Sequence, residues 1–107
     1  MIGRISQKGV FERLAREGRT ARAKGLWVSA MTDSSVGEAH VAYAIGRKSG
    51  GAVQRNRLRR QLRHIVRSCE HALRPGWYLV GVSAGVSGLS FGQMEATLTR
   101  LLAEVQQ

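Results

Sequence analysis

The residues with the clearest chemistry lie at positions 50–67, which read GGAVQRNRLRRQLRHIVR and hold six arginines and no acidic residue. At 100° of rotation per residue, a helix over this segment places Leu58, Leu62, Ile65 and Cys69 in a narrow apolar stripe, with Val66 at its edge. The opposite face then carries Asn56, Arg60, Arg63 and Arg67, flanked by Arg57, Arg59 and His64. Because a guanidinium group can hold two phosphate oxygens at once, this face predicts a phosphate-rich partner.

Repulsion between the arginines must be offset for such a helix to form. Like charges four residues apart cost a few tenths of a kcal/mol each, whereas each fully buried Leu or Ile contributes roughly 1.5–3 kcal/mol. Docking of the apolar stripe therefore explains how the helix survives. It does not explain why the other face lacks glutamates, which a polyanionic partner does explain.

The charge of the whole chain supports the same partner class. Lys and Arg number 17 and Asp and Glu number 7, which gives a net charge of +10. The excess is uneven, since residues 47–67 hold eight basic side chains and no acid, and residues 4–24 hold seven against two acids. Nucleic acid is therefore favoured over a membrane surface, because the apolar stripe is narrow and aliphatic.

Among nucleic acids, RNA is the preferred partner. The chain shows no helix-turn-helix or zinc pattern typical of proteins that read duplex DNA. RNA is commonly bound through phosphates and through stacking of unpaired bases on aromatic rings, which Trp27 and Phe11 could supply. The alternative is that both aromatic residues belong to an ordinary core.

Several other classes of site are not indicated. The single cysteine, Cys69, excludes an internal disulfide and a cysteine-based zinc site. The three histidines have no metal-ligand spacing, and the seven acids are scattered without a pairing suited to acid–base work. No apolar run reaches the ~18 residues of a membrane span, and the N-terminus lacks the apolar stretch of a secretory signal. We therefore expect a cytoplasmic protein without a protein-borne active site.

The pattern along the chain predicts a single domain, residues 1–107, of the α+β class. A first helix lies over SQKGVFERLAREG, with Ser6 as its cap and Gly18 just past its end. The predicted strands are residues 26–31, 41–45 and 77–83, with a short extra strand near residues 20–22. Ser90 and Gln93 form a capping-box pattern that opens the last helix. Its apolar stripe comprises Phe91, Met94, Leu98, Leu101, Leu102 and Val105.

These elements follow the order α-β-β-(β)-α-β-α and predict a two-layer α/β sandwich with a small central sheet. The strand at residues 77–83 is nearly all apolar, so we expect it inside the sheet. Trp27 and Ser29 fall on one face of their strand, and Ala42 and Ala44 share one face of the next.

The segment RKSGGAVQRNRLRRQLR at residues 47–63 closely resembles the signature of the bacterial ribonuclease P protein subunit. That signature is a basic loop followed by Gly-x-Ala-Val-x-Arg-Asn-x-x-Lys/Arg-Arg. This chain supplies it at Lys48, Gly50, Ala52, Val53, Arg55, Asn56, Arg59 and Arg60. The order of helices and strands is similar as well, so the resemblance spans nearly the whole chain.

The resemblance implies that the catalyst is an RNA and that this protein is its accessory subunit. The holoenzyme removes the 5′ leader from precursor tRNA with magnesium ions, which are held mainly by the partner RNA. The implied partners are the catalytic RNA, with one protein per RNA, and precursor tRNA; neither a membrane nor an organic cofactor is implied. It also implies a left-handed crossover around the arginine-rich helix, against the usual topology rule.

The resemblance further implies two sets of site residues. The RNA-binding set is Arg47, Lys48, Arg55, Asn56, Arg57, Arg59, Arg60, Arg63 and Arg67, with an indirect magnesium contact near Asn56. The leader cleft is Phe11, Ala15, Trp27, Ser29, Ala42 and Ala44. This chain departs from the family pattern in lacking aromatic side chains at Ala15 and Ser29, and in lacking a basic residue after Ser83.

Two other functions compete with this interpretation. One is a non-catalytic protein that binds the ribosome or another structured RNA. The other is a protein enzyme that cuts RNA alone. Cleavage of precursor tRNA by RNA-free protein, with and without added catalytic RNA, separates all three.

Overall fold

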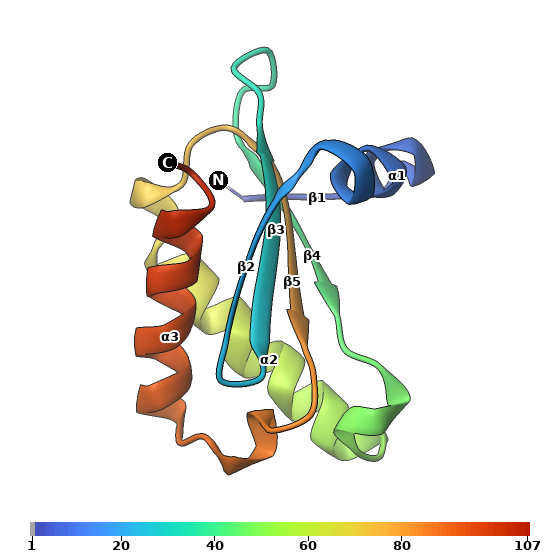
Figure 1. The fold of residues 1–107 in the computed structure, drawn as a ribbon, viewed down its shortest axis with the longest axis vertical. Coiled ribbons are helices and arrows are strands. Elements are labelled where there is room, and N and C mark those ends of the chain that lie inside the picture. The colour runs from blue at the N-terminus through green and yellow to red at the C-terminus, as the bar shows by residue number, and fades with distance from the viewer. Residues whose placement is uncertain (1) are drawn as a thin grey trace.

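The computed structural model describes residues 2–107 and contains one mixed sheet with helices on both faces (Figure 1). In chain order the elements are β1 (Gly3–Arg4), α1 (Lys8–Glu17), β2 (Arg19–Ala23), β3 (Leu26–Thr32), β4 (Ala39–Ala44), the short 3-10 helix η1 (Arg47–Ser49), α2 (Ala52–Ser68), the 3-10 helix η2 (Glu70–Ala72), β5 (Gly76–Val82), the 3-10 helix η3 (Val86–Gly88) and α3 (Phe91–Glu104). The predicted α+β class is confirmed, and so is the element order from α1 onwards. No helix within residues 2–107 is long and apolar enough to cross a membrane.

The five strands lie in the order β1-β4-β5-β3-β2, so the apolar strand β5 is central as predicted. β4 and β5 are parallel neighbours joined through α2, whereas β3 is antiparallel to both β5 and β2. In Figure 1, β4 and β5 both run downwards, α2 passes behind the sheet, and β5 lies to the left of β4. This crossover is therefore left-handed, as the resemblance implied.

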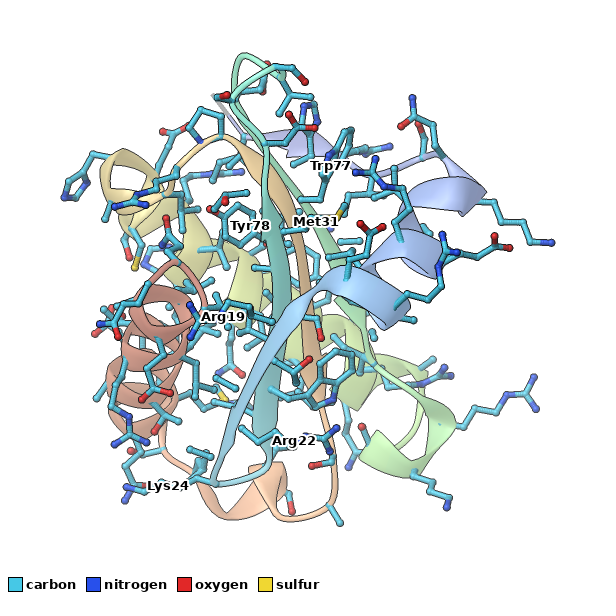
Figure 2. All side chains as sticks on the ribbon, turned by 45° about the horizontal axis from the view of Figure 1, so that its top comes forward. Arg19, Arg22, Lys24, Met31, Trp77 and Tyr78 are labelled. Atoms are coloured by element: carbon cyan, nitrogen blue, oxygen red, sulfur yellow. The ribbon has the colours of Figure 1, made fainter. Side chains whose placement is uncertain are left out.

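The main core lies between the sheet and the pair α2 and α3. Alternate residues of the strands point into it, and Tyr78 and Val80 of β5 are fully buried there. Figure 2 shows the alternation: Tyr78 lies on the side of α3, and its neighbour Trp77 lies with Met31 on the side of α1. The main core thus lies on one side of the sheet, and a second, smaller cluster of buried residues lies on the other.

The apolar stripe of α2 docks on this core as predicted. Leu62, Ile65 and Val66 are each 0% exposed, and Leu58 and Cys69 pack against the core while partly exposed. Val66 was expected only at the edge of the stripe, yet it is as fully buried as Leu62 and Ile65. The reason is that α3 packs against α2 in addition to the sheet, which extends the buried arc.

The first helix covers one end of the opposite sheet face. Val10 and Leu14 are buried against Trp77 in the second cluster. The predicted cap at Ser6 is wrong, because α1 begins at Lys8 and its cap residue, Gln7, makes no side-chain capping bond. Gly18 ends the helix as expected, and its backbone N–H donates to the carbonyl oxygen of Leu14 at 3.0 Å.

The last helix begins with the predicted capping box. The Gln93 N–H donates to Ser90 Oγ at 3.1 Å, and the Ser90 N–H donates to Gln93 Oε1 at 2.8 Å. The predicted stripe is buried except for Phe91, which is 37% exposed and lies at the helix start beside the ring of His64. The two-residue strand β1 was not predicted, since two residues show no alternation.

Candidate nucleic-acid interface

All nine residues of the predicted RNA-binding set lie on η1 and α2, and all of those on α2 except Arg55 lie away from the buried stripe. Seven of them are exposed, and Arg55 and Arg59 are half-buried. Within residues 2–107, the ion pairs join Arg13 to Glu17 and Arg100 to Glu104 and leave the arginines of α2 unneutralised. The helix is therefore apolar on its docked side and cationic on its free side, as the spacing predicted.

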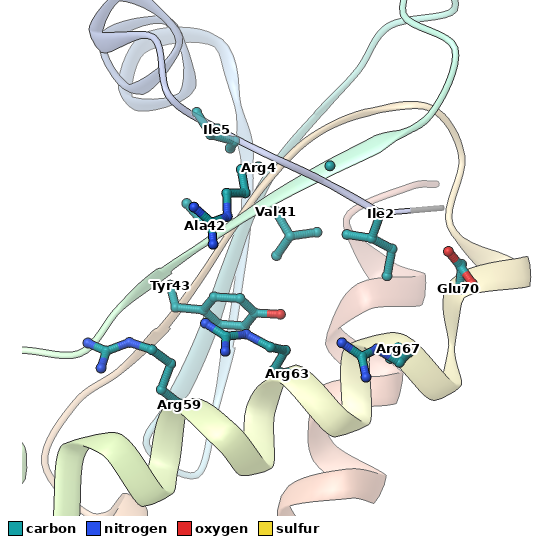
Figure 3. A pocket seen from close by; sticks show the side chains of 11 residues that line it. Ile2, Arg4, Ile5, Val41, Ala42, Tyr43, Arg59, Arg63, Arg67 and Glu70 are labelled. Carbon is teal, nitrogen blue, oxygen red and sulfur yellow. The ribbon is translucent and has the colours of Figure 1, made fainter. Parts of the chain in front are cut away.

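Five of the six arginines of α2 form two rows. Arg59, Arg63 and Arg67 follow the flank of the helix that faces β4 and β1, and we call them the inner row (Figure 3). Arg57 and Arg60 lie outside that flank and are exposed. The two rows present positive charge in two directions, which suits a folded RNA better than a single linear strand.

Contacts within the inner row fix two of its side chains. Arg59 Nη1 donates to Asn56 Oδ1 at 3.0 Å. The guanidinium carbon of Arg63 lies 5.8 Å from the ring centroid of Tyr43 on β4, within the range of a cation–π contact. Burial raises the pKa of Tyr43, while the charges of Arg63 and Arg67 oppose that shift. Tyr43 is thus a neutral phenol under a cationic group.

The four strand residues predicted for the leader cleft come together on the sheet face that α1 leaves partly uncovered. Ser29, Leu79 and Ala42 form one row across β3, β5 and β4. Trp27, Gly81 and Ala44 form the next row. We call these two rows the open face. The predicted cleft residues among them are all half-buried.

Trp27 lies flat on this face because its strand neighbour on β5 is Gly81. A Cβ atom at Gly81 would overlap Cε2 and Cζ2 of the indole. The ring therefore occupies the place that a side chain at this position would fill, and its outer surface remains available for stacking.

Phe11 and Ala15, the predicted cleft residues of α1, are exposed and lie one turn apart on the flank next to the buried Val10 and Leu14. Phe11 is 37% exposed, so it is not part of the core. The helix thus offers an accessible ring on the same side of the sheet as Trp27.

Two residues at the edge of the open face were not predicted as part of the site. Thr20 and Arg22 of β2 pair with Ser29 and Trp27, so all four share one side of the sheet. Thr20 Oγ1 and Ser29 Oγ are hydrogen-bonded at 2.8 Å, and Arg22 brings an exposed charge to the position opposite Trp27. The alternation in RTARA was the available signal, but it was assigned only to a short extra strand.

Comparison with known proteins identifies the family. The family model described as Ribonuclease P matches residues 3–106, which is almost the whole chain. The chain belongs to this family. It is 33% identical over 94 residues to the ribonuclease P protein component of Roseiflexus castenholzii, in a match that covers 86% of this chain and 76% of the relative. It is also 33% identical over 107 residues to that of Acidothermus cellulolyticus, covering 97% and 88% of the two chains.

Solved structures share the fold at lower identity. The ribonuclease P protein of Staphylococcus aureus superposes with a TM-score of 0.85 at 19% identity and covers 95% of both chains. That of Thermotoga maritima gives 0.84 at 21% identity, covering 95% of this chain and 96% of the other. The chain is therefore a protein subunit of the ribonuclease P type, with the α+β fold of that family.

Ribonuclease P membership raises the question of where magnesium is held. Residues 2–107 contain no cluster of three His, Cys, Asp or Glu side chains that could ligate a metal ion. Asn56 Oδ1 already accepts a hydrogen bond from the Arg59 guanidinium, and a positive group at that distance disfavours a divalent cation. The residues near Asn56 thus do not fit a protein-held magnesium site.

Proposed function

We propose that this chain binds the catalytic RNA of ribonuclease P through η1 and α2 and holds the 5′ leader of precursor tRNA on the open face. The observation that carries the proposal is the helix α2. Its apolar side is buried in the core at 0% exposure for Leu62, Ile65 and Val66, while among residues 2–107 its arginines form no ion pair with an acidic side chain. The buried side keeps the helix folded in water, and the free arginines can neutralise the phosphates of an RNA.

In this proposal the catalytic centre is on the RNA, and the magnesium ions are held there. The chain supplies binding, because its arginines neutralise backbone charge and so reduce the repulsion between two large polyanions. Guanidinium groups are suited to this work since each stays charged at every working pH and can bridge two phosphate oxygens.

The open face supplies the contact with the leader. An unpaired base can stack on the exposed surface of Trp27, and every base has a face that such a ring accepts. Arg22 stands beside the indole, where the phosphate next to a stacked base would lie. Phe11 offers a second ring from α1. Binding here needs a single-stranded segment, which precursor tRNA has and mature tRNA lacks.

Reconstitution tests the proposal against its two alternatives. RNA-free protein, catalytic RNA and both together are incubated with precursor tRNA at a magnesium concentration too low for the RNA to act well alone. We expect cleavage at the mature 5′ end with both components and none with protein alone. Cleavage by protein alone would indicate a protein enzyme, and no stimulation of the RNA would indicate a protein for a different structured RNA.

A further inference from the structure

A cavity of about 610 Å³ lies at the sheet edge, where β1, β4 and the inner arginine row of α2 line it (Figure 3). A volume of a few hundred Å³ suits one small ligand or one nucleotide unit and is too small for a duplex. We call this cavity the edge pocket.

Positive charge converges on the edge pocket from two elements that are far apart in the sequence. Arg4 contributes from β1, and Arg59, Arg63 and Arg67 contribute from α2. Within residues 2–107, Arg4, Arg63 and Arg67 form no ion pair. Glu70 also lines the pocket. Four guanidinium groups around one carboxylate leave a strong excess of positive charge, which predicts an anionic ligand.

The other walls of the edge pocket are apolar or aromatic. Ile2 and Val41 line it beside Tyr43, whose hydroxyl group points into the space between Ile2 and Arg67 (Figure 3). The guanidinium of Arg63 lies over the Tyr43 ring. A simple anion such as phosphate would use the arginines and leave these walls unused. A planar base attached to a phosphate would use both.

We propose that the edge pocket takes one unpaired nucleotide of the catalytic RNA, with its base against Tyr43 and Val41 and its phosphates on Arg4, Arg63 and Arg67. This proposal rests on the proposed function, since it needs the chain to bind RNA. Arginine planes and aromatic rings are the groups on which splayed RNA bases stack, and the pocket combines both with aliphatic walls. The nucleotide would join β1 to α2 and so orient the protein on the RNA.

The first test uses the free protein and a defined probe. We expect adenosine 5′-monophosphate to bind at least tenfold more tightly than inorganic phosphate and to shift the NMR signals of the Tyr43 ring. Both effects should be lost in Arg4→Gln, which lies on the edge pocket, and kept in Arg60→Gln, which lies outside it. Equal affinity for the nucleotide and for phosphate would overturn the proposal, because it would reduce the pocket to a general anion site.

The second test asks whether the occupant is part of the RNA. Tyr43→Ala should weaken binding of the catalytic RNA by about fivefold or more, which is the lower end of base stacking, and should leave the salt dependence unchanged. Tyr43→Phe keeps the ring and should bind as the wild type does. Arg4→Gln should weaken binding more than Arg60→Gln does, although both remove one charge.

The outcomes separate the pocket from the wider function. A correctly folded Tyr43→Ala protein with wild-type affinity for the RNA would overturn the assignment to an RNA nucleotide, even if the monophosphate binds. If Tyr43→Ala fails to fold, the comparison of Arg4→Gln with Arg60→Gln decides. Failure of the wild-type protein to bind the catalytic RNA would instead contradict the proposed function, while the monophosphate test would still report on the pocket.

Discussion

Trp27 shows how one residue can depend on the absence of another side chain. Its ring lies on Gly81, and its outer surface forms the stacking platform proposed for the leader. Trp27→Ala should weaken binding of long-leader precursor tRNA by about 1–3 kcal/mol, because one stacked base is lost. Binding of leaderless tRNA should hardly change. Titrations of the reconstituted complex with the two substrates measure the difference.

Gly81→Ala is the matched variant, because it keeps the indole but pushes it off the sheet. It should reproduce part of the loss of Trp27→Ala for the long-leader substrate. Equal losses for long-leader and leaderless substrates would place Trp27 in a different contact, either in the core or on the surface that meets the catalytic RNA.

The buried hydroxyl group of Tyr78 should make the stability of the protein depend on pH in the alkaline range. Its hydroxyl donates to the carbonyl oxygen of Arg74 at 2.7 Å, and burial raises its pKa above the ordinary value of 10.0, although Arg74 opposes the shift. Since a raised pKa favours the neutral phenol in the folded state, its stabilisation is complete below about pH 10 and is lost as the pH rises through the folded pKa. Tyr43 shifts in the same direction.

Urea unfolding of wild type and Tyr78→Phe between about pH 8 and about pH 11 measures this effect. At the lower pH the variant should be less stable by about 0.5–1.5 kcal/mol, the usual value of one hydrogen bond. The gap should narrow above about pH 10, because the variant has no phenol to ionise at this position. A gap that stays constant over the whole range would contradict the prediction.

At the scale of the element, α2 separates stability from binding on its two sides. Leu62→Ala should lower the free energy of unfolding by about 2–5 kcal/mol, because Leu62 is 0% exposed and the substitution leaves a cavity. Arg60→Gln should change it by no more than about 0.5 kcal/mol, because Arg60 is exposed. Thermal or urea melts of the two variants check the contrast, and an unchanged melt for Leu62→Ala would mean that the stripe is not docked.

The elements also show what could be predicted from the sequence. Periodicity identified α2, α3 and the strands β3 and β4, because each buries one regular face, and a nearly continuous apolar run identified β5. It missed β1 and understated β2, since a two-residue strand has no period and RTARA is more polar than a core strand. The predicted cap at Ser6 was wrong because capping depends on where the helix begins. α1 begins at Lys8, one residue later than a cap at Ser6 requires.

In the candidate site, too, helical spacing revealed some features, and others depended on the tertiary structure. The cationic side of α2 was predictable, because helical spacing alone places Asn56, Arg60, Arg63 and Arg67 opposite the apolar stripe. The joining of Ser29 with Ala42 was not predictable from the residues alone, since it depends on the register of β3 and β4 on β5. The edge pocket could not be predicted from the sequence either, because it is lined by Arg4 of β1, and the sequence pattern did not show that strand.

At the scale of the whole molecule, the sheet separates two proposed binding surfaces. Helix α2, which carries the arginines, lies behind the sheet, and the open face lies in front (Figure 1). A catalytic RNA bound to α2 and a leader bound to the open face would therefore not compete for the same residues. The net charge of +10 serves both, because long-range attraction does not depend on which face is approached. Specific orientation must then come from short-range contacts.

The salt dependence of RNA binding tests this arrangement. The logarithm of the association constant should fall linearly with the logarithm of salt concentration, with a slope of about −0.7 to −0.9 for each phosphate neutralised. Replacing Arg60 and Arg63 together with glutamine removes one charge from the inner row and one from outside it. If each contacts one phosphate, the slope should become shallower by about 1.4–1.8.

Arg100→Gln is the control, because Arg100 lies on α3 and pairs with Glu104 at 3.7 Å. Its slope should equal that of the wild type, although the net charge falls by one in the same way as in a single variant of α2. A slope that responds equally to Arg100→Gln and to changes on α2 would show that the RNA senses only the total charge. An unchanged slope in the Arg60 and Arg63 double variant would remove α2 from the interface. The expected pattern, shallower for α2 and unchanged for α3, requires phosphates to sit on the arginine side of this one helix.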